Sequence, residues 1–358
     1  MIKYTIRRLI QAIPIFFGIT LLSYLLMTAA PGGPTSALAM DPRIPPQQRQ
    51  AMAARLGVND PWPVQYLRWL LGDDWMRVDT DGDGLADIAR LIPLDADGDG
   101  RPEPAGRRKG ILRGDFGESF FQRRPVITMI EEKIGPTLEL GLASLIVGLV
   151  IGLPVGIIAA VRRGGWFDNV TRVLAVMFNA VPVFWLGLIL LMIFSFRLQL
   201  LPSGGQCGLV LSGGCPPIYQ RLEYLLLPTL VLSTGAIAIY SRYIRASMLD
   251  VIHQDYMRTA LSKGLPGKDV WFKHGARNAL IPLATFLGPA ITGLLSGAVI
   301  TETIFSWPGL GRLGVTAVIQ QDFPVVMAVV IMASIATILG FLLSDILYAI
   351  IDPRIRFD

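Results

Sequence analysis

Six apolar stretches, each long enough to cross a lipid bilayer, constrain the fold of this chain more than any other feature. A helix needs about 20 apolar residues to span about 30 Å of hydrocarbon. The stretches are Ile10–Ala30, Leu138–Val161, Val173–Phe196, Leu225–Ile244, Ala279–Ile300 and Val325–Ile351. They are continuous, unlike the short alternating segments of a membrane β-barrel. Only 16% of the residues are charged, against about 25% in soluble proteins. The sequence therefore predicts an all-α membrane protein with six transmembrane helices.

Basic residues in the short connecting segments predict the orientation. The positive-inside rule places Lys-rich and Arg-rich short loops in the cytoplasm. Such residues precede the first run, separate the second from the third, and follow the fourth and the sixth: Lys3, Arg7, Arg8, Arg162, Arg163, Arg172, Arg245, Arg258, Lys263, Lys268, Lys273, Arg277, Arg354 and Arg356. We expect both chain ends inside (N-in/C-in). A cleaved signal peptide is the alternative for the first run, whose 21 residues exceed the about 7–15 apolar residues of a signal.

The runs divide the chain into three predicted parts. Residues 1–30 hold the N-terminal segment and first helix, residues 31–137 form a long extracytoplasmic loop, and residues 138–358 hold the other five helices. A P-loop for ATP is absent from the sequence, because its single Gly-Lys pair, Gly267-Lys268, is followed by Asp269 rather than Ser or Thr. The runs also hold no nucleophile–base pair or metal-ligand cluster, so we expect a non-catalytic protein.

Residues 250–278 are too polar to span the membrane. The breaker Gly264-Leu265-Pro266-Gly267 divides them and predicts two short helices. Basic residues alternate there with Tyr256, Trp271 and Phe272, a composition that suits helices at a membrane interface. Taken alone, the composition favours an ordinary cytoplasmic loop.

The order of residues in this loop resembles a known family. The stretches Asp255–Gly264 (DYMRTALSKG) and His274–Pro282 (HGARNALIP) are similar to the EAA loop of ABC importer permeases, specifically those of the peptide, dipeptide and nickel family. Further landmarks of that family follow in order along nearly the whole chain: Pro31–Pro34, Pro63–Leu67, Gly114–Gly117, Arg124–Val126, Pro136–Leu140, Phe305–Gly311 and Asp352–Arg356.

The resemblance implies a fold, a function and a set of partners. The fold is that of a type I ABC importer permease, located in a prokaryotic inner membrane. The function is ATP-driven import of peptides by alternating access, with no nucleotide bound by this chain. The implied partners are a second homologous permease subunit, two ATP-binding cassette subunits and an extracytoplasmic substrate-binding protein, within a lipid bilayer and without nucleic acid.

Two alternatives remain for the function. Within the family, the substrate could be a nickel chelate or another small solute. From a different class, the chain could be a secondary transporter or channel with a calcium-responsive external domain. That reading requires paired broken helices carrying ion ligands, and the sequence shows no such pairing.

The resemblance also implies which residues couple transport to ATP hydrolysis. The family's EAA triplet falls on Arg258, Thr259 and Ala260, and its glycine on Gly264. Arg-Thr-Ala departs from the literal Glu-Ala-Ala. By resemblance, this loop forms a coupling helix that docks into a groove of the ATPase subunit. A small residue at position 260 would permit close approach, and Gly264 would permit the turn.

Residues 73–112 have no counterpart in the resemblance and are rich in Asp and Gly. Two segments place carboxylates at positions 1, 3, 5 and 9 and Gly at position 6, which is the pattern of a calcium loop. Backbone carbonyls at position 7 would add ligands. The predicted ligands are Asp79, Asp81, Asp83, Leu85 and Asp87 in the first loop and Asp95, Asp97, Asp99, Arg101 and Glu103 in the second.

Position 12 of these loops is not the Glu of an EF-hand, because Arg90 and Gly106 stand there. The loops are therefore more similar to dockerin or thrombospondin-type repeats. We expect structural Ca²⁺, and a solvated acidic turn is the alternative.

The remaining candidates are two cysteines and a few polar residues within the runs. Cys207 and Cys215 lie in the segment expected outside after the third run, where an oxidising compartment favours a disulfide; free thiols are the alternative. Asn179, Glu139 and Asp345 could line a substrate path. Intramembrane Asn more often bonds neighbouring helices, so Asn179 is a weak candidate.

Overall fold

The computed structural model describes residues 2–29, 60–95, 100–208, 214–283, 290, 292–293 and 298–351. Two compact units divide the chain. The core unit consists of Met1–Ala12, Lys133–Arg312 and Ile335–Asp358, and the loop unit consists of Ile13–Glu132 and Leu313–Ser334. Neither unit is one continuous segment, so linear boundaries at residues 30 and 137 separate residues that belong to the same unit.

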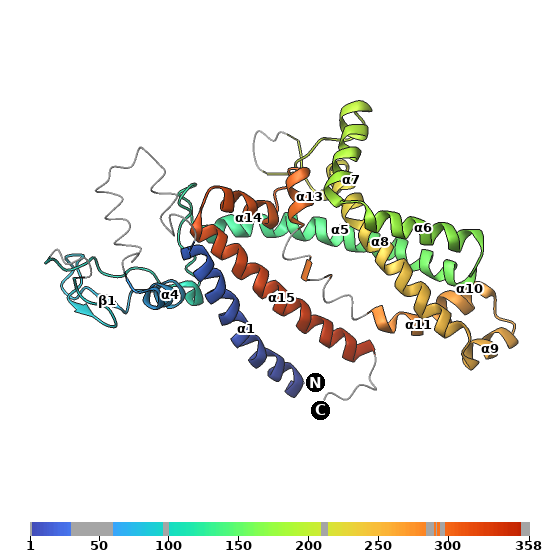
Figure 1. Ribbon diagram of the computed structural model, residues 1–358, viewed down its shortest axis with the longest axis horizontal. Coiled ribbons are helices and arrows are strands. Elements are labelled where there is room, and N and C mark those ends of the chain that lie inside the picture. Colours follow the sequence, from blue (N-terminus) through green and yellow to red (C-terminus); the bar gives the residue numbers. More distant parts are fainter. Residues whose placement is uncertain are drawn as a thin grey trace. The chain divides into compact units, whose positions relative to one another are not determined.

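Among the described residues, four helices are long and apolar enough to cross a membrane. They are α1 (Ile2–Ala29), α5 (Val126–Val161), α8 (Leu222–Ile252) and α15 (Phe323–Ile351), shown in Figure 1. These helices contain the first, second, fourth and sixth predicted runs almost entirely. Helix α5 begins well before its apolar run and α8 continues past Ile244, because helical hydrogen bonding does not stop where the apolar composition ends.

The third run does not form one straight helix. It is divided into α6 (Trp166–Ala180) and α7 (Val183–Leu190), which continues as the π-helical stretch η3 (Leu191–Arg197). The two parts are bent by 98°. Pro182 explains the break, because it lacks a backbone N–H and disfavours helical geometry at Val181, whose φ and ψ are −75° and 123°. With this bent pair counted as one span, the described residues hold five candidates.

The fifth predicted run, Ala279–Ile300, lies mostly outside the described residues. Its ends fall in α11 (Ala276–Ala279), the 3-10 turn η6 (Ile281–Leu283) and the start of α13 (Val299–Ile304). The sixth transmembrane helix therefore stays a prediction.

Helices α5 and α8 of the core unit approach closely along a row of glycines. Gly148, Gly152 and Gly156 recur at every fourth position of α5, on one face. A Cβ atom built on Gly156 would lie 2.6 Å from the backbone oxygen of Ser241 in α8. Small residues at this spacing allow helix backbones to meet in membranes, where dispersion contacts drive association.

A buried ion pair joins α6 to α8. Arg245 donates from Nε and Nη2 to the two carboxylate oxygens of Asp168, at 2.5 and 2.8 Å. The Asp168 side chain is only 1% exposed, and it also accepts a hydrogen bond from the Gly164 backbone N–H at 2.9 Å. Such bidentate geometry fixes both distance and orientation, so it orients α6 on α8 near the Arg-rich turn.

A second polar link ties α5 to the start of α14 (Leu310–Ile319). The fully buried carboxylate of Glu302 in α13 accepts from Thr137 Oγ1 at 3.3 Å and from the Arg312 N–H at 2.9 Å. Thr137 Oγ1 accepts in turn from the Leu310 N–H at 2.7 Å. Side-chain oxygens thus bind free N–H groups at the start of α14. Nearby, Trp307 Nε1 donates to the Pro136 carbonyl at 2.8 Å.

The loop unit has an aromatic core. Tyr24 of α1 contacts the rings of Tyr66, Trp69 and Phe323 at centroid distances of 5.6–5.7 Å. Tyr66 and Trp69 belong to α4 (Trp62–Leu71), and Phe323 begins α15. Asp322 accepts hydrogen bonds from the Ser119 hydroxyl and the Phe120 N–H, at 2.5 and 3.1 Å.

Beside this core, the described part of residues 73–112 (73–95 and 100–112) forms a small folded segment. It contains the two-residue antiparallel strands β1 (Arg77–Val78) and β2 (Ile88–Ala89) and the 3-10 turn η2 (Ile111–Arg113). Buried charges connect it to α4, since Arg68 pairs with both Asp60 and Asp73. Oppositely charged partners allow these groups to be buried.

Candidate functional site

The segment at 250–278 folds as the two short helical pieces that its breaker predicts. Helix α9 (Asp255–Ser262) is followed by a turn and by α10 (Gly267–Asp269), which continues through the π-helical stretch η5 (Val270–Gly275) into α11. Gly264 has φ +72°, a left-handed conformation that favours glycine. Pro266 then begins the second piece, with its fixed φ suited to a helix start.

The two faces of α9 differ sharply. Met257 and Ala260 are buried against Val270, and the methyl ends of Met257 and Met248 cover Gly275. The opposite face is open, with Tyr256 39% and Leu261 48% exposed. Exposed apolar side chains next to a buried seam are typical of a surface that meets another protein.

The structure separates the four predicted coupling residues. Arg258 and Thr259 lie on the open face of α9, and Gly264 forms the turn. Ala260 is only 7% exposed and packs inside the chain. The small size of Ala260 therefore serves the packing of α9 against η5, which the one-dimensional motif could not reveal.

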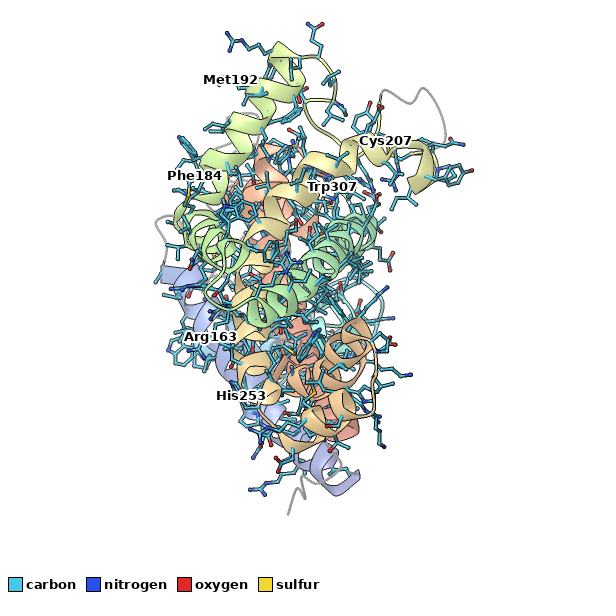
Figure 2. The ribbon with its side chains drawn as sticks, turned by 90° about the vertical axis from the view of Figure 1, so that its right-hand side faces the viewer. Arg163, Phe184, Met192, Cys207, His253 and Trp307 are labelled. Carbon is cyan, nitrogen blue, oxygen red and sulfur yellow. A yellow bond between two sulfur atoms is a disulfide. The ribbon has the colours of Figure 1, made fainter. Side chains whose placement is uncertain are left out.

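The two ends of the core unit carry different chemistry. Arg163 and His253 lie toward the end that holds α9, whereas Met192 of the α7–η3 arm and Cys207 lie toward the other (Figure 2). This arrangement puts the predicted cytoplasmic residues together and the predicted external cysteine apart from them.

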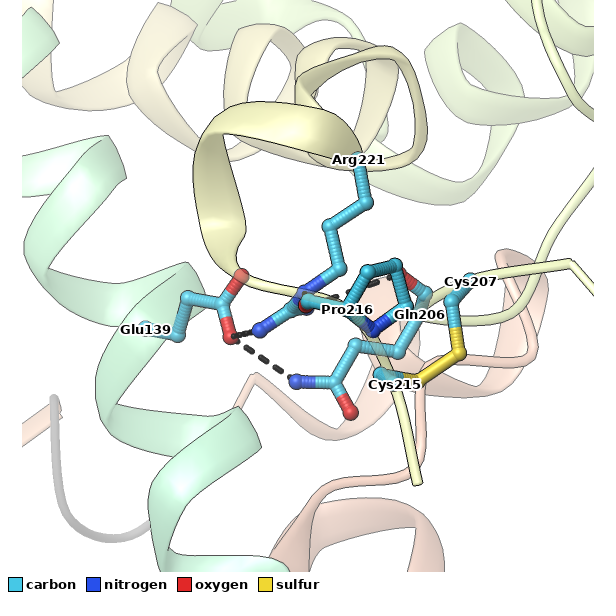
Figure 3. The surroundings of a disulfide bond; sticks show 6 residues. All are labelled: Glu139, Gln206, Cys207, Cys215, Pro216 and Arg221. Carbon is cyan, nitrogen blue, oxygen red and sulfur yellow. Dashed lines mark hydrogen bonds and ion pairs between the residues drawn. A yellow bond between two sulfur atoms is a disulfide. The ribbon is translucent and has the colours of Figure 1, made fainter. Parts of the chain in front are cut away.

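A disulfide closes the loop between α7 and α8. Cys207 and Cys215 are bonded, with their Cα atoms 5.8 Å apart. Next to it, Glu139 of α5 accepts from Arg221 Nη2 at 2.7 Å and from Gln206 Nε2 at 2.8 Å (Figure 3). The carboxylate of Glu139 thereby connects the disulfide loop to α5.

The other polar residues of the runs are placed differently. Asp345 of α15 forms an ion pair with Arg8 of α1 at 3.0 Å, within the core unit. Asn179 is exposed in the last turn of α6, just before the bend at Val181 and Pro182.

The first predicted calcium loop gathers three carboxylates. Oxygen atoms of Asp79, Asp81 and Asp87 all lie within 4.8 Å of one another. Asp79 also accepts from the Gly82 and Gly84 N–H groups at 2.6 and 2.9 Å, and these hydrogen bonds lower the pKa of its carboxyl. Carboxylate oxygens so close together are the ligands that Ca²⁺ prefers.

The other predicted ligands that the structure describes make separate contacts of their own. Asp83 accepts from the Leu85 N–H at 2.7 Å. In the second loop, Asp95 accepts from the Gly100 N–H at 2.8 Å, which repeats the bond from position 6 to position 1 of the first loop. Glu103 is buried, 3.9 Å from Arg77, while Arg101 is exposed. Asp97 and Asp99 lie outside the described residues.

Sequence reasoning missed the polar groups buried in the loop unit. Arg68 and Asp73 meet Arg108 beside α4, although Arg108 lies 35 residues from Asp73 in the sequence and no motif predicts this pairing of charges. These charged residues line a cavity of the loop unit together with residues of the landmark stretches Pro63–Leu67 and Gly114–Gly117. The order of those landmarks signalled importance without indicating what they build.

Comparisons with known proteins cover the whole chain. The family model described as "Binding-protein-dependent transport system inner membrane component" matches residues 152–357, and the model for the N-terminal part of such components matches residues 1–80. The oligopeptide transport system permease protein AppB of Bacillus subtilis (strain 168) is 38% identical, over 100% of both chains. The dipeptide transport system permease protein DppB of Escherichia coli (strain K12) is 34% identical, over 99% of both chains.

A solved structure shares the fold. A chain from inward-facing conformations of the MetNI methionine ABC transporter matches with a TM-score of 0.50 and 18% identity, covering 63% of this chain and 97% of that chain. The full-length relatives, the two family models and the several apolar helices agree. The chain is therefore a multi-pass inner-membrane protein and belongs to the family of binding-protein-dependent transport system inner membrane components.

Proposed function

We propose that this chain is the permease subunit of an ATP-driven importer of short peptides. The observation that carries the proposal is the full-length similarity to an oligopeptide permease, at 38% identity. In this proposal a type I permease fold with six spans and both termini in the cytoplasm pairs with a second, homologous permease. A binding protein delivers the peptide outside, and two ATPase subunits drive the change between inward-open and outward-open states.

The open face of α9 is the proposed docking surface for the ATPase. It carries Arg258 and Thr259 beside the exposed apolar side chains of Tyr256 and Leu261. Its buried face packs on η5 through Met257, and Val251 of α8 packs against the same cluster. A displacement of α9 would therefore be transmitted to α8 through packed side chains. Rigid packed elements transmit displacement in this way.

Replacing Thr259 by Asp tests this assignment. The Thr259 hydroxyl donates to the Asp255 carbonyl at 3.0 Å, and the equally exposed Thr303 donates to the Val299 carbonyl at 2.7 Å. Thr303→Asp is therefore a matched control in α13. We expect Thr259→Asp to abolish peptide uptake and co-purification of the ATPase while the chain still inserts, and Thr303→Asp to retain both. Normal peptide uptake and normal co-purification of the ATPase with Thr259→Asp would contradict the assignment of the open face of α9 as the docking surface.

The substrate assignment has its own test. Cells that lack this chain should lose uptake of labelled dipeptides, and the wild-type gene should restore it. If the wild-type gene instead restores uptake of a nickel chelate and not of peptides, the substrate belongs to the alternative class.

The proposal includes structural Ca²⁺ in residues 79–103. Its support is the cluster of Asp79, Asp81 and Asp87 oxygens and the equivalent N–H bonds to Asp79 and Asp95 in the two loops. The ion would offset the mutual repulsion of carboxylates and fix the external surface on which a binding protein lands. Calorimetry on the purified full-length protein should give calcium-dependent heat that Asp81→Asn weakens. Asp74→Asn, which alters a partly exposed carboxylate paired with Arg113 outside both loops, is the control, and equal heats for both variants would reject the site.

A further inference from the structure

The loop unit contains a cavity that the coupling role does not use. It encloses about 50 Å³, enough for a small polar group. It is lined by residues of α1, α4, the folded segment at 73–112, the stretch Gly114–Gly117 and the start of α15. Aromatic rings of Tyr24, Trp69 and Phe120 line one part of it.

Arg108 supplies the cavity with a cation whose guanidinium has no hydrogen bond or ion pair with the described residues. Its backbone is held firmly, because its N–H donates to Asp73 Oδ1 at 2.8 Å and its carbonyl accepts from the Asp73 N–H at 3.0 Å. Desolvation lowers the pKa of Arg108, and no neighbouring carboxylate compensates for it fully. Arg108 is partly exposed, so the five N–H donors of its guanidinium can reach water or a ligand in the cavity.

The nearby carboxylates accept hydrogen bonds from donors other than the Arg108 side chain and keep further lone pairs free. Asp73 accepts from Arg68 Nη2 at 3.0 Å. Asp115 accepts from the N–H groups of Lys109 and Gly117, each at 3.0 Å. These acids balance the charge of the wall at a distance, but they leave the Arg108 guanidinium available for a ligand.

A second recess of about 290 Å³ adjoins the first and shares Arg108, Asp115, Gly117 and Phe120 with it. It adds the side chains of Glu118 and Arg123. Two basic and two acidic residues therefore line each recess, so its walls are balanced in charge. Balanced walls favour a ligand that carries both charges over a simple anion, whose approach the two acids would oppose.

We propose that this two-part cavity binds a short zwitterionic peptide by its ends. The peptide carboxylate pairs with Arg108 through the two-pronged geometry that guanidinium groups form. The peptide ammonium lies beside Asp115 and Glu118, and an apolar side chain fits among Trp69 and Phe120. A dipeptide spans about 7 Å when extended, which suits neighbouring recesses. The inference rests on the proposed peptide import and adds a site, within the loop unit, at which substrate is held by the permease itself.

The test measures direct binding of Ala-Phe to the assembled transporter in nanodiscs without the binding protein. Ala-Phe is compared with its C-terminal amide and its N-acetyl derivative. A charge-assisted pair contributes about 1.5–3 kcal/mol, so each blocked peptide should bind about ten- to a hundredfold more weakly. Arg108→Gln should weaken Ala-Phe to the same extent, whereas the exposed neighbouring Arg107→Gln, outside both recesses, should bind like the wild type.

Several results would overturn the inference. They are wild-type affinity in Arg108→Gln, equal binding of the amidated peptide, or no saturable wild-type binding at millimolar Ala-Phe. The blocked-peptide comparison uses the unaltered chain, so it stands if Arg108→Gln fails to fold. Arg108→Lys keeps the positive charge but loses the planar, two-pronged guanidinium, so this variant should bind Ala-Phe with intermediate affinity. Uptake assays separate the two proposals: a transporter that binds Ala-Phe but imports no peptide contradicts the proposed function alone, and one that imports peptides without this binding contradicts the site alone.

Discussion

Replacing Gly156 by Ala should force α5 and α8 apart. The new Cβ would lie 2.6 Å from the Ser241 backbone oxygen and 3.0 Å from Ile244 Cβ. Ordinary contact begins near 3.4 Å, so the two helices must separate by up to about 0.8 Å, because a backbone oxygen in a helix cannot swing aside. Overpacking of this kind costs about 1–3 kcal/mol.

Gly235→Ala in α8 separates packing from helix propensity, because Gly235 lies in a membrane-spanning helix as Gly156 does and precedes no proline. Its Cβ would meet nothing within 4 Å. The substitution should therefore raise the free energy of unfolding only by the about 1 kcal/mol by which Ala is more favourable than Gly in a helix interior. The two substitutions share that gain. The difference between their free energies of unfolding therefore isolates the clash, and we expect Gly156→Ala to be the less stable by about 1–3 kcal/mol.

The assay is unfolding of the purified protein in rising sodium dodecyl sulfate, followed by circular dichroism. Peptide uptake by each variant gives the functional readout. Equal midpoints for Gly156→Ala and Gly235→Ala would refute the close α5–α8 contact, because only the first substitution introduces the clash.

Three further outcomes follow from single contacts. Arg245→Met should destabilise the protein by about 3–5 kcal/mol in the same unfolding assay, because it leaves the Asp168 carboxylate buried and unpaired; the exposed Arg242→Met should stay within about 0.5 kcal/mol. Cys207→Ser should cost about 2–3 kcal/mol for a short ring, and added reductant should lower wild-type stability to the same value; no effect of either would show that the loop is held without the disulfide. Calcium affinity should fall on acidification, starting with Asp81. The Asp83 N–H lowers the pKa of that carboxyl, but desolvation and neighbouring carboxylates outweigh it and raise the pKa, so Asp81 takes up a proton first; calorimetry across pH that shows constant affinity down to the ordinary aspartate pKa would contradict this order.

Much of the membrane architecture follows from the sequence, because apolar length is a one-dimensional property. Four predicted runs lie within long helices, since a span needs only a sufficient number of consecutive apolar residues. The same count did not indicate the bend within Val173–Phe196, where hydropathy is continuous but Pro182 redirects the backbone by 98°. A hydropathy count does not register a missing N–H, although the proline itself was visible in the sequence.

The sites depended on tertiary structure to a greater extent. The sequence by itself predicted two short helical pieces around a glycine turn at 250–278, because the order and spacing of residues carry that signal along the chain. Only the fold decided that Ala260 faces η5 while Thr259 faces outward, and that Glu139 meets Arg221 across two helices. It also decided that Arg108 enters an aromatic cavity. Which side chains meet across elements depends on helix rotation and crossing, and these are set by packing between distant segments, which no local pattern encodes.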